Sequence, residues 1–298
     1  MGTDAVLSLV AQRWSGLQRL RERCGDENLD FQAHGGYELF LQGSEAYKEC
    51  ARQIPFLNEQ LTSIIGGTPI FTKEKNVEKF GFGKVKNIIF NRFEGQINPA
   101  KMMGRLRFLA NQLGIQILTG LTITNLVENK EDVALEIENA NPIKVAKVLV
   151  ATNGFTTKLL PNIALRPARN QVLITKPIPN LKLKGTFHFD QGYYYFRNFE
   201  DRILLGGARN QAKEEETTHE FGLTPLIQDT LMDFLTSVIL PNQSFEIAHR
   251  WSGILGVGNQ KAPIVQKHSA HIGVAVRLGG MGVAIGSLVG EEGAKLFM

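Results

Sequence analysis

A glycine-rich stretch near the end of the chain has residue types and spacing that could bind an anion. Ile272–Val276 is a short apolar, β-branched run, which is typical of a buried strand. Gly279, Gly280 and Gly282 follow in a loop whose backbone a ligand could approach closely. Val283–Phe297 then has helical spacing. Strand, glycine loop and helix in this order point free backbone N–H groups at an anion. The spacing is not G-x-G-x-x-G, so a tight turn before a packing helix is the alternative interpretation.

Arg277 directly follows the apolar run, at the mouth of this loop. A charge in that place is unusual, because the preceding residues predict a buried strand. The guanidinium could face a bound ligand, or it could form an ion pair with Glu291 or Glu292 on the following helix.

A polar turn follows another predicted buried strand. Thr152, Asn153 and Gly154 come directly after Lys147–Ala151. Ligands of α/β proteins bind at the carboxyl ends of such strands. The sequence therefore makes this turn a candidate binding segment, with a simple connecting turn as the alternative.

Tyr193, Tyr194 and Tyr195 lie on one predicted strand, so Tyr193 and Tyr195 share a face. Their hydroxyls could orient an amine or a carboxylate, although aromatic residues on a strand more often fill a core. His249 is a further candidate for catalysis, and a structural role is its alternative. No cluster of residues has metal-ligand spacing.

The elements around these residues divide into two kinds. Asn98 and Pro99 predict the start of a helix that ends near Leu113, and Ile115–Leu118 predicts a short buried strand. The following runs predict a three-stranded meander and another buried strand: Thr122–Glu128, Val133–Asn139, Ile143–Ala146 and Lys147–Ala151. Together they indicate half of a nucleotide-binding α/β domain.

Alternating segments elsewhere predict antiparallel strands. These are Asn170–Lys176, Gly185–Asp190, Gly192–Arg197, Arg202–Ala208 and Ser244–Ser252. Helical spacing predicts helices at Asp4–Cys24, at Glu45–Leu61 with an interruption near Pro55, and at Thr224–Leu240. The α/β part is thus interrupted by an antiparallel part and resumes at the C-terminus.

Composition limits the function classes. With 298 residues, 43% hydrophobic and 21% charged, the chain can form two domains with buried cores. A net charge of +4 without a basic cluster does not indicate nucleic acid binding. Cys24 and Cys50 have no metal-ligand neighbours and suggest a reducing compartment, so we expect a cytoplasmic protein without a membrane span.

Four stretches carry a family resemblance: Glu94–Lys101, Val148–Gly154, Arg250–Gly256 and Gly279–Gly290. In their order and spacing they resemble the FAD-dependent amine and amino-acid oxidoreductases of the D-amino-acid oxidase, glycine oxidase and sarcosine oxidase family. The resemblance covers about residues 28–298.

The resemblance implies a mixed α/β (α+β) fold. An FAD/NAD(P)-binding Rossmann-like domain, residues 1–27, 95–165 and 250–298, would be interleaved with an antiparallel-sheet substrate or cap domain, residues 28–94 and 166–249. The implied cofactor is FAD, and Trp251 would pack in the core behind its ring. The candidate cofactor-binding residues are Thr122, Thr152, Asn153, Gly154, Gly253, Gly279, Gly280, Met281, Gly282 and Val283. The candidate catalytic residues are Arg277, Tyr193, Tyr195 and His249.

Two departures from the family pattern bear on function. The family's first β-α-β unit, with its G-x-G-x-x-G loop, has no counterpart here, so we expect a truncated chain and an incomplete parallel sheet with the Ile115 and Val148 strands apart. Leu255 stands about where glycine-oxidase-like members carry an arginine for the substrate carboxylate. Either another arginine serves, or the substrate is not a simple amino acid.

The expected activity is oxidation of a CH–NH bond of a small amine or amino acid by hydride transfer to flavin, with oxygen or an electron carrier as acceptor. The truncated chain could be inactive by itself. The alternatives are a non-catalytic fragment or binding module that does not retain FAD, and a fusion-derived domain such as the flavin half of a tRNA-modifying enzyme, which the weak basic balance disfavours.

Overall fold

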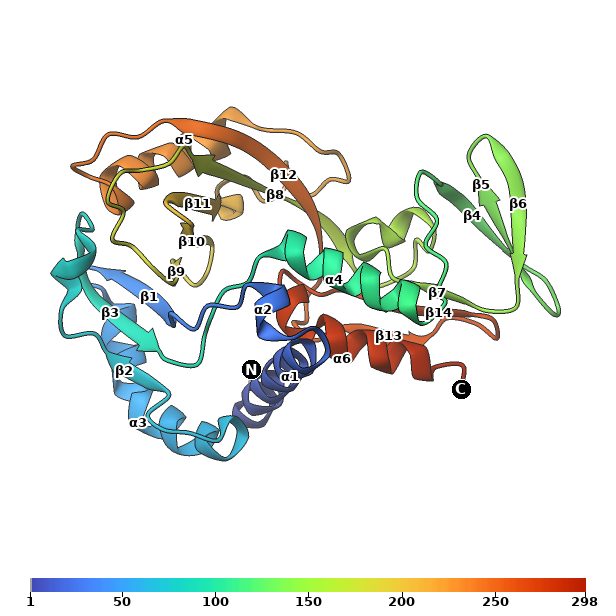
Figure 1. Cartoon of the computed structure of the whole chain (residues 1–298), viewed down its shortest axis with the longest axis horizontal. Helices are drawn as coiled ribbons and strands as arrows, with labels where there is room; N and C mark the ends of the chain where they lie inside the picture. The colour runs from blue at the N-terminus through green and yellow to red at the C-terminus, as the bar shows by residue number, and fades with distance from the viewer. Residues whose placement is uncertain (1) are drawn as a thin grey trace.

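The computed structural model describes residues 2–298 and contains an eight-stranded sheet, a smaller parallel-containing sheet and a projecting meander (Figure 1). The helices are α1 (Thr3–Cys24), α2 (Asp26–Leu29), α3 (Glu45–Ile65), α4 (Pro99–Gln112), α5 (Pro225–Phe234) and α6 (Gly282–Lys295). A π-helical turn, Leu235–Ile239, extends α5, and Asn153–Lys158 forms a 3₁₀ helix. The mixed α/β fold expected from the sequence is confirmed.

The eight-stranded sheet has the order β12-β8-β11-β10-β9-β1-β3-β2. Its strands are β1 (Gly36–Leu41), β2 (Phe71–Lys73), β3 (Val85–Asn91), β8 (Arg166–Thr175), β9 (Thr186–Phe189), β10 (Tyr194–Phe199), β11 (Arg202–Gly207) and β12 (Ile247–Val257). Neighbouring strands are antiparallel except β1 and β9. The strand β12 pairs with β8 as far as Val257, so the domain boundary predicted at 249/250 falls inside this strand.

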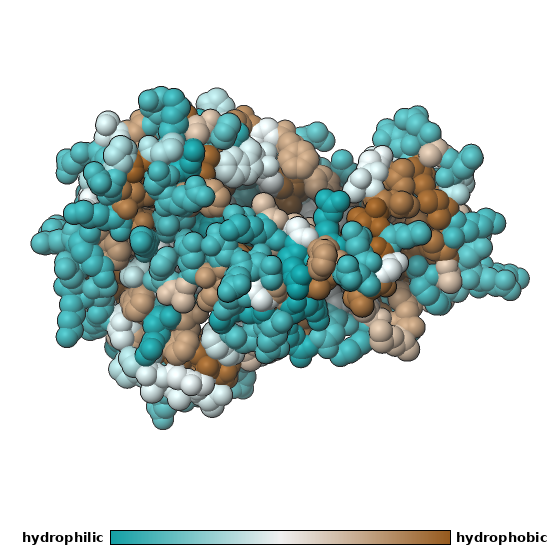
Figure 2. All heavy atoms as spheres, in the orientation of Figure 1, coloured by the Kyte–Doolittle hydropathy of each residue, from teal (hydrophilic) through white to brown (hydrophobic). Residues whose placement is uncertain are grey.

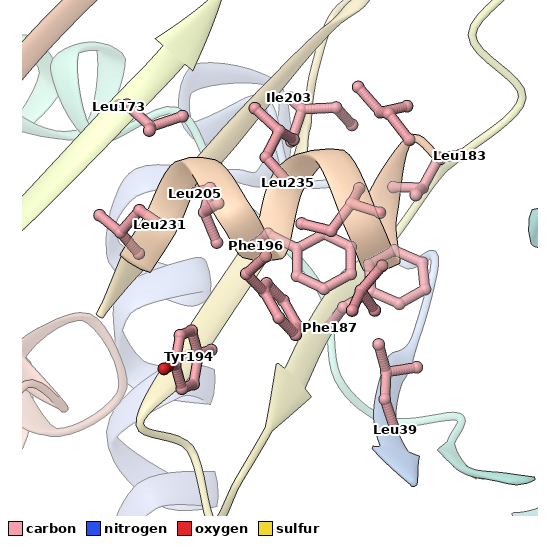
Figure 3. Close-up of a cluster of buried hydrophobic side chains, with 14 of the residues drawn as sticks. Leu39, Leu173, Leu183, Phe187, Tyr194, Phe196, Ile203, Leu205, Leu231 and Leu235 are labelled. Atoms are coloured by element: carbon pink, nitrogen blue, oxygen red, sulfur yellow. The ribbon is translucent and has the colours of Figure 1, made fainter. Parts of the chain in front are cut away.

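Helix α5 covers one face of this sheet and builds the main core. Leu231 and Leu235 point from α5 and its π-helical extension onto Phe196 and Leu205 of the strands (Figure 3). Phe187 on β9 stacks on Phe196 with ring centroids 4.8 Å apart. Because side chains alternate along a strand, the residues between these core positions lie on the opposite side of the sheet, called the far face below.

Two three-stranded sheets form the remainder. One has the order β13-β14-β7, with β13 (Ile264–Lys267), β14 (Ile272–Val276) and β7 (Val148–Val150), and β7 runs parallel to β14. The other is the predicted meander, β4 (Ile123–Glu128), β5 (Val133–Ile137) and β6 (Ala140–Val145). Every residue of β14 is buried, as its apolar run predicts.

Two predicted features are wrong. Ile115–Leu118 forms no strand, and Ile115 and Leu118 are 54% and 66% exposed. A short apolar run becomes a strand only when another strand supplies its hydrogen bonds, and within residues 2–298 none lies beside it. Helix α3 runs without interruption through Pro55, which is exposed, so that water can satisfy the carbonyl that the missing proline N–H leaves free.

Candidate functional site

The loop between β14 and α6 has the open backbone that its glycines predict. Gly279 and Gly280 have φ angles of 56° and 81°, in the left-handed region that favours glycine. A Cβ at Gly279 would meet nothing within 4 Å, and a Cβ at Gly280 would meet only Leu255 Cδ1 at 3.9 Å. A planar ligand can therefore approach this backbone closely.

Backbone N–H groups in this loop are free to donate. The Gly279 N–H donates to the Gly256 carbonyl and the Met281 N–H to the Leu278 carbonyl. In the described part of the chain, the N–H groups of Gly280, Gly282 and Val283 have no backbone acceptor. These three donors lie at the positive end of the α6 dipole, so they suit a group that carries negative charge.

Arg277, at the start of the loop, is held by hydrogen bonds to two backbone carbonyls. Its Nε donates to the Ala262 carbonyl at 2.8 Å and its Nη1 to the Ala164 carbonyl at 3.1 Å. Neither glutamate considered from the sequence is its partner, since Glu291 pairs with Arg19 and Lys295. The side chain is 8% exposed, and burial lowers its pKa.

The turn after β7 contacts the same loop. Asn153 adopts a left-handed φ of 45°, and its Oδ1 accepts from the Leu278 N–H at 3.2 Å. A Cβ at Gly154 would meet the Leu255 carbonyl oxygen at 2.6 Å, so this glycine permits close packing against β12. The Thr152 hydroxyl bonds that of Thr156 at 3.1 Å. Asn153 thus helps to fix the glycine loop, and Gly154 lets the turn pack against β12.

A row of side chains crosses the far face of the eight-stranded sheet. Strand pairing places Trp251 opposite Val172, Tyr195 opposite His188, and His188 opposite Glu38. Directly opposite residues on neighbouring strands have Cβ atoms about 5 Å apart. The row thus brings aromatic, imidazole and carboxyl groups onto one surface.

Tyr195 brings a hydrogen-bonded hydroxyl group to this surface. Gly206 lies opposite it, and a Cβ there would meet the Tyr195 hydroxyl and the Val172 side chain. The hydroxyl accepts from Asn170 Nδ2 at 2.8 Å. Burial raises the pKa of Tyr195 to about 12, so the hydroxyl stays protonated and can donate a hydrogen bond. Tyr193 precedes it by two residues and is 39% exposed.

Glu38 brings a carboxyl group to the same face. Burial, with Glu94 and Asp190 nearby, raises its pKa to about 7. In residues 2–298 its side chain has no hydrogen-bond or ion-pair partner. A carboxyl group with such a pKa can exchange a proton near neutral pH.

A buried polar network joins β8 to the segment before α5. Arg169 donates to Glu216 through Nε and Nη2, at 2.9 and 2.8 Å. Gln171 and Thr224 donate to the same carboxylate. Hydrogen bonds from these groups and from Arg169 lower the pKa of Glu216, against the effect of burial. The network thus fixes β8, the strand that carries Asn170 on the far face.

Of the other predicted residues, Thr122 lies apart from this surface, and three residues of β12 lie at its edge. Thr122 precedes β4 in the meander, is exposed, and its carbonyl accepts from the Glu138 N–H. His249 is exposed on β12 opposite Ile174. Trp251 is 43% exposed, so its expected place in the core is wrong. Gly253 lies opposite Asn170 with open space around it.

Comparison with known proteins decides the family. Residues 3–296 match the family model described as "FAD dependent oxidoreductase". The chain belongs to the FAD-dependent oxidoreductase family. The cofactor of this family is FAD, and the open loop with free N–H groups at Gly280, Gly282 and Val283 fits the electron-accepting edge of that group.

Solved structures of this family share the fold at low sequence identity. L-proline dehydrogenase from P. horikoshii has a TM-score of 0.78 and 17% identity, covering 97% of this chain and 78% of the other. Iminodiacetate oxidase from Chelativorans sp. BNC1 has a TM-score of 0.78 and 15% identity, covering 98% and 79%. Glycine oxidase from Geobacillus kaustophilus has a TM-score of 0.77 and 16% identity, covering 100% and 80%.

A curated relative is the bifunctional protein ThiO/ThiG of Trichormus variabilis (strain ATCC 29413 / PCC 7937). It is 23% identical over 186 residues, which are 61% of this chain and 28% of the relative. The match thus spans little more than a quarter of that relative's length. No helix of residues 2–298 is long and apolar enough to cross a membrane.

Three residues of the site were not singled out from the sequence. Glu38 shows a weak signal, since it is a lone carboxyl group between Tyr37 and Leu39 in an apolar strand. Asn170 and His188 carry no such signal, because only the register of β8, β9 and β10 brings them to Tyr195. Long-range pairing, which local patterns do not encode, determines this part of the site.

Proposed function

We propose that the protein oxidises a CH–NH bond of a small amine or amino acid. The observation that carries the proposal is the set of free N–H groups at Gly280, Gly282 and Val283. They lie beside β12, the edge strand of the sheet whose far face carries Tyr195. The family assignment supports redox chemistry with FAD, and the names of the solved relatives point to amine-containing substrates.

The protein's residues would hold the cofactor and orient the substrate, and FAD, when bound, accepts the hydride. Donation from Gly280, Gly282 and Val283 would stabilise negative charge at the electron-accepting edge of the cofactor. The Tyr195 hydroxyl, positioned by Asn170, would orient the substrate amine. Removal of comparable donors in other enzymes lowers the rate by roughly 10²–10³.

The visible spectrum of the purified protein tests this proposal. We expect flavin bands near one equivalent, with or without added FAD, and bleaching of these bands when a substrate amine is added without oxygen. A protein that stays colourless with excess FAD, or a bound flavin that no amine reduces, would contradict amine oxidation. Re-oxidation by oxygen, compared with that by an artificial acceptor, would separate an oxidase from a dehydrogenase.

The second candidate is a binding module that presents the far face without retaining FAD. The exposure of Ile115 and Leu118, and the free edge of β7 in its sheet, favour it, because the sheet beside the glycine loop has little cover there. It predicts amine binding by a colourless protein. Calorimetric titration of the colourless protein with amines measures that binding directly.

A further inference from the structure

Arg13 on α1 has an unused guanidinium group. It is half-buried, and within residues 2–298 it has no hydrogen-bond or ion-pair partner. Two other arginines of the same helix are paired, Arg19 with Glu291 and Arg21 with Asp26 at 2.7 Å. Burial lowers the pKa of Arg13, while Glu94 acts in the opposite direction. Its five N–H donors have no acceptor within these residues, and none of its nitrogens is fully enclosed, so they are available to a ligand that enters from solvent.

Helix packing places Arg13 at the level of the glycine loop. Gly16 packs directly on the backbone of Ala284, and Arg19 pairs with Glu291, so α1 and α6 run side by side in the same direction. Arg13 precedes Gly16 by three residues, about 4.5 Å along the helix axis. The corresponding step back along α6 from Ala284 reaches its N-terminus at Met281 and Gly282.

Residues next to the eight-stranded sheet also lie near Arg13. Trp14 beside it contacts Phe93 edge-on, with ring centroids 5.9 Å apart, and Glu94 is close enough to affect the charge of Arg13. Glu94 lies against Gly36 on β1 and is 3.5 Å from the Thr186 hydroxyl on β9. Arg13 therefore lies between the glycine loop and the β1–β9 part of the far face.

Four other inward-facing arginines each donate to at least one group of the protein. Arg169 is bound by Glu216, Arg197 donates to the Ile97 carbonyl, Arg250 to Gln228 and Arg277 to two carbonyls. Leu255, where a carboxylate-binding arginine was expected, has no charge. Among these five arginines, Arg13 is the one that has no acceptor within residues 2–298, and it lies near the glycine loop.

We propose that Arg13 binds the carboxylate of the substrate, which makes the substrate an amino or imino acid and not a simple amine. A guanidinium presents two parallel N–H groups that match the two oxygens of a carboxylate. The inference rests on the proposed function, since it assigns a substrate class to the same site. It differs from the sequence expectation in taking the arginine from α1 instead of β12.

Pairs of ligands test the proposal, because one member of each pair has carboxyl groups and the other has none. Proline with pyrrolidine, and iminodiacetate with diethylamine, are titrated by calorimetry into FAD-supplemented wild type, Arg13→Met, Arg13→Lys and Arg23→Gln. Arg23 is an exposed arginine of the same helix and serves as the matched control. We expect wild type to prefer the carboxylates, and Arg13→Met to lose about 10- to 100-fold in carboxylate affinity. Arg13→Lys should retain part of that affinity, and Arg23→Gln should bind as wild type.

Two results would overturn the assignment. One is wild-type carboxylate affinity in Arg13→Met, and the other is a wild type that binds neither carboxylate or prefers the simple amines. Flavin reduction by pyrrolidine with no effect of Arg13→Met would remove the Arg13 assignment and leave amine oxidation standing. Loss of carboxylate binding in Arg13→Met, with no flavin reduction by any ligand, would keep the Arg13 site and remove the oxidation proposal.

Discussion

At the scale of single residues, Glu38 should make the stability of the protein depend on pH. Its pKa is raised to about 7 in the folded state from 4.5, so the folded protein holds a proton that the unfolded chain releases. The contribution of Glu38 to the free energy of unfolding is fully present below pH 4.5 and is lost as the pH rises to about 7. The loss amounts to about 3 kcal/mol. We expect Glu38→Gln, which stays neutral, to gain stability over wild type progressively across that window.

Urea denaturation at several pH values between 4.5 and 8 measures this difference. Glu59→Gln, an exposed change on α3, is the control and should follow wild type at every pH. A Glu38→Gln difference that stays constant across the range would refute the ionisation of Glu38 as the cause.

At the scale of elements, the contact of α1 with α6 fixes Arg13 beside the glycine loop. A Cβ at Gly16 would lie 3.0 Å from the Ile285 Cα and closer still to the Ala284 carbonyl oxygen, and backbone cannot move aside locally. Gly16→Ala should therefore separate the helices and cost about 1–3 kcal/mol, despite the better helix propensity of alanine. Thermal unfolding should show a lower Tm for Gly16→Ala.

Gly290→Ala is the matched control for this change. Gly290 is an exposed glycine within α6, and a Cβ there would meet nothing within 4 Å. The same substitution should raise stability by up to about 1 kcal/mol at this position. Equal effects of the two substitutions would show that helix propensity, not the helix contact, determines the outcome.

Elements with local determinants could be predicted from the sequence, while those with long-range determinants could not. Asn98 caps α4 as expected, since its Oδ1 accepts from the N–H groups of Ala100 and Lys101. The glycine loop before α6 is likewise encoded by its own residues. The run at Ile115–Leu118 has a strand pattern but no neighbouring strand to pair with. The sequence likewise predicts site residues in the loop and at Tyr195. It does not predict Glu38, because only the pairing of β1 with β9 brings that residue to the site.

At the scale of the whole molecule, apolar side chains gather at the end that carries the meander. Figure 2 shows hydrophobic residues over the segment after α4 and over the meander. Leu113, Ile115 and Leu118 are 78%, 54% and 66% exposed, and α4 itself buries none of its residues. Contiguous exposed apolar surface of this kind drives association. The isolated protein should therefore self-associate at micromolar concentration and bind a hydrophobic dye.

Polar substitutions on this segment should reverse that behaviour. Light scattering and dye fluorescence of the pair Leu113→Gln and Leu118→Lys should show less association, with Tm within about 2 °C of wild type, because these side chains lose no buried contacts. Leu226→Lys, at a 52% exposed position on α5 remote from this segment, controls for added charge. Equal loss of association in the control would assign the effect to net charge. A fall in Tm in the double variant would mean that the segment is packed in solution, which would contradict its exposure.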